Sequence, residues 1–273
     1  MTNIITFLNV KGGVGKTTIC LNLAHALKIV DDKSVLLVDL DHQENLSLRA
    51  IKNRKEKRSS SYDLISNEEI EAIDCIYDSV VPNTKIIPAD IQLQKALKEL
   101  DPSIDPSLHC VLGDKLKPVL ASYDYVLIDT HPTLDLISTI GLMSSNFYCI
   151  PIKPEPDSLV GIKWTDSYLK NVVKANKELK DLGIVMTDAD RRTNIAIELA
   201  ETIKRKYGDR FMDTIIGRNV AITDAAMEGK TIFQYDFRQK GCKYFREFAA
   251  EVIKKCEGKK IVLGEEQEAE KTG

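Results

Sequence analysis

The chain has 273 residues, 43% hydrophobic and 29% charged, a composition that suits one large α/β domain or two small ones. The formal net charge of -3 leaves no global basic field, so binding to nucleic acid or membrane must come from a local patch. Six scattered cysteines without a Cys-x-x-Cys pair disfavour a disulfide framework or a zinc site, and no leader or bilayer-spanning apolar run is present, so we expect a soluble cytoplasmic protein.

Short runs rich in β-branched residues alternate with longer segments of helical spacing. We expect strands at Ile4–Val10, Ser34–Leu40, Lys85–Ile87, Tyr125–Asp129, Phe147–Ile152, Gly183–Thr187 and Asp213–Ile216. Most are continuously apolar, which is typical of strands covered on both faces of a parallel sheet. Helical spacing is found at Lys16–Ile29, Ile91–Leu100, Ser107–Leu120, Ser158–Leu179, Asn194–Tyr207 and Phe237–Cys256. This alternation predicts a doubly wound α/β fold, with a mostly parallel sheet flanked by helices.

Two polar segments interrupt this alternation. Lys52–Ser61, "KNRKEKRSSS", is a basic run expected to form a loop. Gly264–Gly273, "GEEQEAEKTG", is an acidic tail expected to be disordered. No linker long enough to separate domains is visible, so residues 1–263 are predicted to form a single domain.

The first expected strand runs into the sequence Lys-Gly-Gly-Val-Gly-Lys-Thr-Thr at positions 11–18, and a helical pattern follows at once. Glycines allow the backbone to turn tightly and direct N–H groups at phosphate oxygens, and the helix N-terminus adds its dipole. This context favours a P-loop NTPase over a glycine-rich turn without function. The predicted nucleotide-binding residues are Gly12, Gly13, Val14, Gly15, Lys16, Thr17 and Thr18. Lys16 would reach the β- and γ-phosphates, and the Thr17 hydroxyl would hold Mg²⁺.

The loop has a second lysine, Lys11, and Val10 stands where the ordinary P-loop has its first glycine. This form, Lys-Gly-Gly-x-Gly-Lys-Thr, resembles the deviant Walker A loop of the ParA/MinD ATPases. The resemblance implies ATP and Mg²⁺ as cofactors and a homodimer in the ATP state, in which Lys11 touches the nucleotide of the other subunit. Two ATP-loaded faces pressed together concentrate negative charge that such a lysine would neutralise. By residue type alone, Lys11 would be a solvated loop lysine.

The segment "SVLLVDLDHQENLS" carries two carboxylates at the end of its apolar run. Residues two apart on an extended backbone share a face, so Asp39 and Asp41 can both point at the phosphate crevice. The segment resembles the D-x-D-x-Q stretch of the family, which implies that Asp41 orients the attacking water and that Asp39 sits near the hydrated metal. An acidic turn after a strand is the alternative.

The segment "YDYVLIDTHPT" is a second apolar strand ending in a carboxylate, and it resembles a Walker B motif. The resemblance implies that Asp129 binds Mg²⁺ through water. The following residues, Thr130 to Pro132, resemble the switch region of the family, with His131 where a proline is usual. His131 would be either a structural switch residue or a general base.

The resemblance covers nearly the whole chain and is closest to the ParA/Soj partition ATPases. Segments near Ile216–Asn219 contact the adenine in that family, so Arg218 and Asn219 are predicted base-pocket residues. The family binds DNA nonspecifically as an ATP-bound dimer, and the basic cluster predicted to do so comprises Arg191, Arg192, Lys204 and Lys206. Arg192 matches an arginine of the "RTN" stretch, although Ala221 stands where a second DNA-contacting arginine is often found. Lys163, Lys170, Lys174 and Lys177 share one face of an expected helix and are interpreted as a solvated face.

The predicted function is therefore DNA partition by a cytoplasmic, nucleoid-associated ATPase whose hydrolysis is stimulated by a ParB-like centromere-binding protein. A MinD-like regulator that cycles on a membrane is one alternative. The acidic end "KKIVLGEEQEAEKTG" does not resemble a membrane-binding amphipathic helix, so no stable membrane association is expected. A P-loop enzyme acting on a small molecule is the second alternative, and stimulation of its ATPase by a metabolite but not by DNA would distinguish it.

Overall fold

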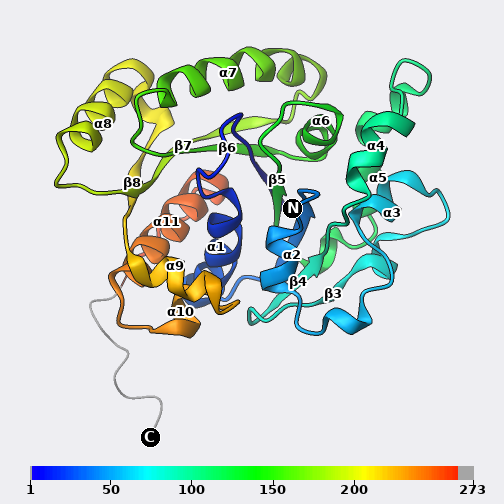
Figure 1. Ribbon diagram of the computed structural model, residues 1–273, viewed down its shortest axis with the longest axis horizontal. Coiled ribbons are helices and arrows are strands. Elements are labelled where there is room, and N and C mark those ends of the chain that lie inside the picture. Colours follow the sequence, from blue (N-terminus) through cyan, green and yellow to red (C-terminus); the bar gives the residue numbers. More distant parts are fainter. Residues whose placement is uncertain (1, 264–273) are drawn as a thin grey trace, which may run out of the picture.

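The structure is a computed structural model and describes residues 2–263, so the predicted acidic tail lies outside the described residues. An eight-stranded sheet has the order β3-β4-β2-β5-β1-β6-β7-β8 (Figure 1). Among the strands within residues 2–263, only the β3–β4 pair is antiparallel. The strands are β1 (Asn3–Phe7), β2 (Val35–Leu40), β3 (Tyr77–Asp78), β4 (Thr84–Ile87), β5 (Tyr125–Thr130), β6 (Phe147–Ile152), β7 (Lys180–Ala189) and β8 (Phe211–Gly217).

Helices cover both faces of this sheet (Figure 1). One face packs against α1 (Lys16–Asp31), α2 (Asn45–Ala50), α9 (Val220–Met227), α10 (Ile232–Tyr235) and α11 (Lys240–Glu257). The other packs against α3 (Ser61–Ser66), α4 (Leu93–Glu99), α5 (Val111–Leu116), α6 (Leu136–Met143), α7 (Ser158–Ala175) and α8 (Asn194–Tyr207). The predicted doubly wound α/β architecture is confirmed.

Burial on both faces explains why the strands are continuously apolar. In β2, Val35 and Leu37 join the core under α1 and α11, whereas Leu36 and Val38 join the core on the opposite face. All four side chains are fully buried. A strand between two helical layers has no solvent face, so no polar alternation survives in its sequence.

The sheet order brings the functional segments together. β5 lies between β1 and β2, and its Asp129 pairs in register with Asp39 of β2 and with Phe7 of β1. The glycine loop follows β1 directly. The carboxyl ends of these three parallel strands therefore place the loop beside both carboxylates, at the edge where open α/β sheets bind ligands.

Two predicted helices end well before the expected residue. The segment expected to be helical at Ser107–Leu120 consists of a 3-10 turn, Pro106–Cys110, and α5, which ends at Leu116. Pro118 follows two residues later and has no backbone N–H with which to continue the helix. The helix expected to reach Leu179 ends at Ala175, since Asn176 is extended and its Nδ2 donates to the carbonyls of Leu142 (3.0 Å) and Ser145 (2.8 Å). Lys177 therefore lies beyond α7.

Several short elements were not predicted: the edge strand β3 and the helices α2, α3, α6, α9 and α10. The predicted loop at Lys52–Ser61 contains one 3-10 turn, Arg54–Glu56, and its last residue begins α3. Further 3-10 turns are Ala72–Cys75, Leu120–Ser122 and Gly208–Arg210. In the described part of the chain, no helix combines the length and apolar character needed to cross a membrane.

Candidate functional site

The glycine loop between β1 and α1 is held in a tight conformation. Gly13 (φ 73°) and Gly15 (φ 90°) have left-handed backbone angles, which glycine adopts without strain. Gly15 is also the N-cap of α1. The Thr187 hydroxyl of β7 lies within hydrogen-bond distance of the carbonyls of Val14 (2.7 Å) and Ile152 (3.0 Å). The Thr187 side chain thus connects the loop to β6 and β7.

Lys16 and Thr17 occupy the inner end of this loop. Lys16 is 7% exposed, and its Nζ donates to the carbonyl of Asn9 (3.4 Å). Burial lowers the pKa of Lys16, while the nearby charges of Asp129 and Asp41 act in the opposite direction. The Thr17 hydroxyl donates to Asp129 Oδ2 (2.6 Å). A cation and a hydroxyl thus face a carboxylate at the start of α1, where anions bind favourably.

Asp129 has the features of a magnesium site. Its side chain is fully buried, and its Oδ1 has no hydrogen-bond partner among the described residues. Burial raises the pKa of Asp129 to about 8, and the charge of Asp39 adds to that effect. An orphaned carboxylate oxygen beside the Thr17 hydroxyl fits a hard cation, which would restore the ionised form.

Residues 2–263 contain no group of three or more His, Cys, Asp or Glu side chains arranged to hold a metal. Mg²⁺ commonly binds proteins through only one or two carboxylates, with phosphates and waters completing the shell. Thr17 and Asp129 would therefore hold the ion together with a nucleotide.

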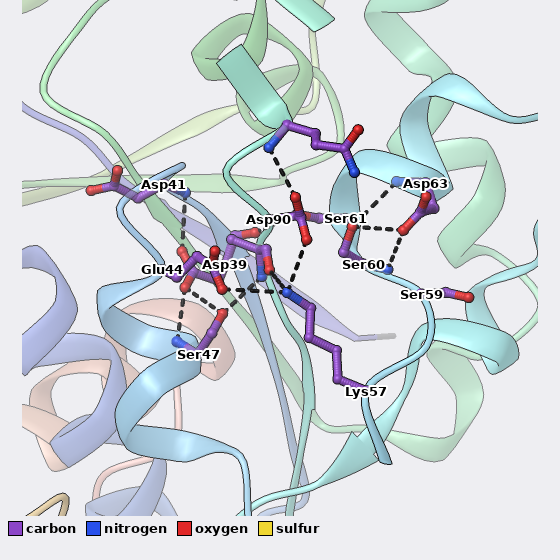
Figure 2. A network of polar contacts seen from close by, with 12 residues as sticks. Asp39, Asp41, Glu44, Ser47, Lys57, Ser59, Ser60, Ser61, Asp63 and Asp90 are labelled. Atoms are coloured by element: carbon purple, nitrogen blue, oxygen red, sulfur yellow. Dashed lines mark hydrogen bonds and ion pairs between the residues drawn. The ribbon is translucent and has the colours of Figure 1, made fainter. Parts of the chain in front are cut away.

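Asp39 has a different environment. Its Oδ1 accepts from the backbone N–H of Asp41 (3.0 Å), and its Oδ2 accepts from the N–H (2.8 Å) and hydroxyl (2.6 Å) of Ser47 (Figure 2). Burial raises the pKa of Asp39 to about 6, against the effect of these hydrogen bonds. Both oxygens are thus occupied by protein donors, and a role near the hydrated metal stays a prediction.

Asp41 lies at the end of the same strand, 7% exposed. Its Oδ1 accepts from the backbone N–H of Gln43 (2.9 Å). The nearby His131 is bound through Nε2 to Asp135 (2.6 Å) and through Nδ1 to the Leu40 carbonyl (3.4 Å). Burial would lower the pKa of His131, but these partners raise it above the usual value. Its contacts link the end of β2 to Asp135, the N-cap of α6.

Lys11 lies at the outer end of the loop, apart from Lys16. Its Nζ forms ion pairs with Glu155 and Asp157, which precede α7. Burial would lower the pKa of Lys11, but the two carboxylates raise it above its usual value. The two lysines of the loop therefore have different surroundings: one is buried at the phosphate end and the other is held by a pair of surface carboxylates.

A cavity of about 160 Å³ adjoins the loop. Its lining includes the predicted residues Gly13, Gly15, Thr18 and Asn219. Arg218 is not part of the lining. Its guanidinium pairs with Asp188 (3.0 Å) and its side chain is 62% exposed.

Several lining residues were not predicted from the sequence, among them the polar residues Lys153, Thr187 and Asp188. Thr187 is the polar end of an expected strand, which could have indicated a site residue. Asp188 has a left-handed backbone (φ 50°) and pairs with Lys153 (3.1 Å), and neither feature has a local sequence signal.

The predicted DNA-binding residues form two separate groups. Arg191 and Arg192 lie in the turn before α8, whereas Lys204 and Lys206 lie in its last turn, about 15 Å along the axis from its first residue at a rise of about 1.5 Å per residue. Arg192 makes two bonds to Asp190 (both 2.9 Å), and Lys204 pairs with Asp213 (3.4 Å). Arg191 donates to the Ile215 carbonyl (2.9 Å).

Comparison with known proteins gives consistent matches. Residues 2–181 match the family model for an AAA domain. The chain is 36% identical over 253 residues to the sporulation initiation inhibitor protein Soj of Bacillus subtilis, covering 92% of this chain and 98% of Soj. It is 31% identical over 253 residues to the chromosome partitioning protein ParA of Caulobacter vibrioides, covering 92% and 93% of the two chains.

Two solved structures share the fold. Cobyrinic acid a,c-diamide synthase from Mycobacterium smegmatis, with bound ADP and magnesium, has a TM-score of 0.80 at 23% identity and covers 97% of this chain and 100% of its own. The septum site-determining protein MinD from Pyrococcus horikoshii, complexed with Mg-ADP, has a TM-score of 0.74 at 27% identity and covers 92% and 96%. With the family match and the identity to Soj and ParA, these findings show that the chain belongs to the ParA/Soj family of P-loop ATPases.

Proposed function

We propose that this ATPase serves DNA partition: two copies close face to face around two Mg·ATP molecules, the dimer binds DNA nonspecifically, and hydrolysis releases it. The observation that carries the proposal is the separation of the two loop lysines. Lys16 is buried at the phosphate end of its own site, whereas Lys11 stays at the outer edge in surface ion pairs. A cation in that position can reach a second subunit once it leaves these two carboxylates.

Within one subunit, the loop glycines and the N-terminus of α1 cradle the triphosphate, and Lys16 neutralises its β- and γ-phosphates. Thr17 and Asp129 would hold Mg²⁺, which would shield the phosphate charge. Asn219 and the other lining residues of the cavity receive the base. The orphaned Oδ1 of Asp129 and the Thr17 hydroxyl support this arrangement.

Asp41 orients the water that attacks the γ-phosphate, and the products are ADP and phosphate. Because this chemistry depends on positioning, turnover by the isolated protein is slow and rises when a partner completes the site. The partner is a ParB-like centromere-binding protein, and the ATP-bound dimer resides on the nucleoid. The similarity to the chromosome partitioning protein ParA of Caulobacter vibrioides supports this role.

Sedimentation with a non-hydrolysable ATP analogue and magnesium tests the dimer. The unmodified protein should sediment as a dimer, and Lys11→Ala should stay monomeric while it still binds nucleotide. Lys16→Ala should lose nucleotide binding altogether. A monomeric unmodified protein at saturating analogue would overturn the proposal.

Asp41→Ala tests the chemical step. This variant should bind ATP and remain a dimer, because only the water-orienting group is removed, and its turnover should fall by about two orders of magnitude. Turnover at the unmodified rate would remove Asp41 from the mechanism.

A further inference from the structure

A buried polar network holds the segment that carries Asp41 (Figure 2). The backbone N–H of Asp41 donates to Asp39 Oδ1 (3.0 Å), and Asp39 Oδ2 accepts from the N–H (2.8 Å) and hydroxyl (2.6 Å) of Ser47 in α2. Asp39 is fully buried and Ser47 is 3% exposed, so water does not readily replace these bonds. Ser47 thus orients the carboxylate that in turn holds Asp41.

The Ser47 hydroxyl is also fixed from a third segment. Its oxygen accepts from the backbone N–H of Ala89 (2.7 Å), two residues beyond the end of β4. A hydroxyl that donates to a carboxylate and accepts from a backbone N–H has a defined orientation. One oxygen atom therefore connects the end of β4 with the carboxylate at the end of β2.

Lys57 contacts the far end of the segment 41–44, which begins with Asp41. Its Nζ contacts Glu44 (3.3 Å), the Ala89 carbonyl (2.6 Å) and Asp90 (3.2 Å). Glu44 has a left-handed backbone (φ 55°), and its N–H donates to the Asp41 carbonyl (2.8 Å). Residues 41–44 are thus anchored at both ends to the stretch 89–90.

We propose that Ser47 is a positioning residue for ATP hydrolysis: it orients the Asp39 carboxylate and, through it, the backbone of Asp41. This inference rests on the proposed role of Asp41 in orienting water. Ser47 does not line the nucleotide cavity, so its loss leaves nucleotide affinity unchanged and slows the chemical step. A displacement of about 1 Å in a group that positions reactants costs about a hundredfold in rate, and a smaller displacement costs less.

The test compares Ser47→Ala with Ser61→Ala. Ser61 is a matched control because it is also fully buried and its hydroxyl donates to the backbone carbonyl of Asp39 (2.7 Å), not to the carboxylate. We expect kcat to fall about tenfold or more in Ser47→Ala, with KM and analogue affinity within about twofold. Ser61→Ala should keep kcat within about twofold of the unmodified protein. Its midpoint of unfolding should fall by about as much as that of Ser47→Ala.

Equal kcat values for the two variants would overturn the inference. If Ser47→Ala fails to fold, Ser47→Cys and Ser61→Cys repeat the comparison, because a thiol is of similar size but a weak donor. Asp41→Ala distinguishes a failure of the proposed role of Ser47 from a failure of the proposed role of Asp41. If Asp41→Ala is slow while Ser47→Ala matches the control, only the role of Ser47 fails; if Asp41→Ala turns over normally, the proposed role of Asp41 fails.

Discussion

At the scale of single residues, the ion pairs of Lys11 set a condition for the proposed dimer. Its Nζ is shared between Glu155 and Asp157 of the same subunit. A lysine that reaches the nucleotide of a second subunit must leave both carboxylates. The two states therefore compete for one cation, and the intramolecular pair favours the monomer.

Removing the two carboxylate charges should strengthen the ATP-dependent dimer. In the double variant Glu155→Gln, Asp157→Asn, Lys11 has no charged partner to leave, so we expect the dimer dissociation constant to fall by about two- to tenfold, the range typical of exposed ion pairs. Sedimentation with a non-hydrolysable ATP analogue measures this constant. Asp78→Asn removes a comparable exposed pair with Lys85 and serves as the control. A weaker dimer in the double variant would show that these carboxylates help to form the interface.

The phosphate side of the proposed site has stronger sequence signals than the base side. The residues proposed to contact the triphosphate are contiguous, or end apolar strands, so a motif and its spacing predict them. Asp188 and Lys153 reach the cavity from separate strands and are joined only in the fold. The bonds that occupy Asp39 involve Ser47, eight residues later, and no spacing rule indicates them.

At the scale of elements, the predicted helices are those with a signal in their own sequence, and the unpredicted helices are those without a strong one. The sequence identifies α1 and α8 because each has several turns of periodic apolar residues. Two of the short helices depend on distant groups: a backbone N–H of α2 donates to Asp39, and the N–H of Ile232 in α10 donates to Asn22, 210 residues earlier. Local caps do exist, such as the capping box formed by Ser60 and Asp63 at the start of α3, but helices of only a few residues have too few turns for a periodic apolar pattern.

Helix α10 depends on a buried histidine, which makes its attachment sensitive to pH. His25 of α1 bonds through Nδ1 to the hydroxyl of Thr231 (2.6 Å), the N-cap of α10, and its ring lies 5.1 Å from that of Phe233. Burial lowers the pKa of His25 to about 4. The unfolded chain thus binds the proton more tightly, so the stabilisation is complete above about pH 6.5 and decreases as the pH falls towards 4.

We expect His25 to contribute a loss of about 3 kcal/mol in the free energy of unfolding between pH 6.5 and 4. Chemical denaturation across this range measures the loss, and other titrating groups cancel when the unmodified protein is compared with His25→Gln. His109→Gln, in the 3-10 turn Pro106–Cys110, is the control and should retain the full pH slope. An identical slope in His25→Gln would contradict the prediction.

At the scale of the whole molecule, electrostatics limits where DNA can bind. With 38 Lys and Arg against 41 Asp and Glu, the average field repels a polyanion, so contact requires a local surface where basic charge is in excess. Asp190 occupies the guanidinium of Arg192 with two hydrogen bonds. Lys170 and Lys174 on α7, by contrast, are exposed and have no ion pair within residues 2–263.

The basic residues at the two ends of α8 remain the predicted DNA surface. Because Arg192 is paired with Asp190, one substitution should weaken DNA binding and another should strengthen it. Arg192→Ala should weaken ATP-dependent DNA binding by about three- to tenfold at low salt and reduce the slope of log K against log salt by about 1. Asp190→Asn should strengthen binding, because it releases the same guanidinium to a phosphate. Fluorescence anisotropy with a duplex of arbitrary sequence measures both, with ATP affinity as the check on folding.

Lys170→Ala on α7 distinguishes the two basic surfaces. If DNA lies along α8, removing a lysine from the outer face of α7 changes only the long-range field, and the salt slope stays that of the unmodified protein. A reduced slope in Lys170→Ala together with an unchanged slope in Arg192→Ala would place the DNA on α7. Because each contacted phosphate releases its own counterions, the two slopes assign the surface independently of how tightly either variant binds.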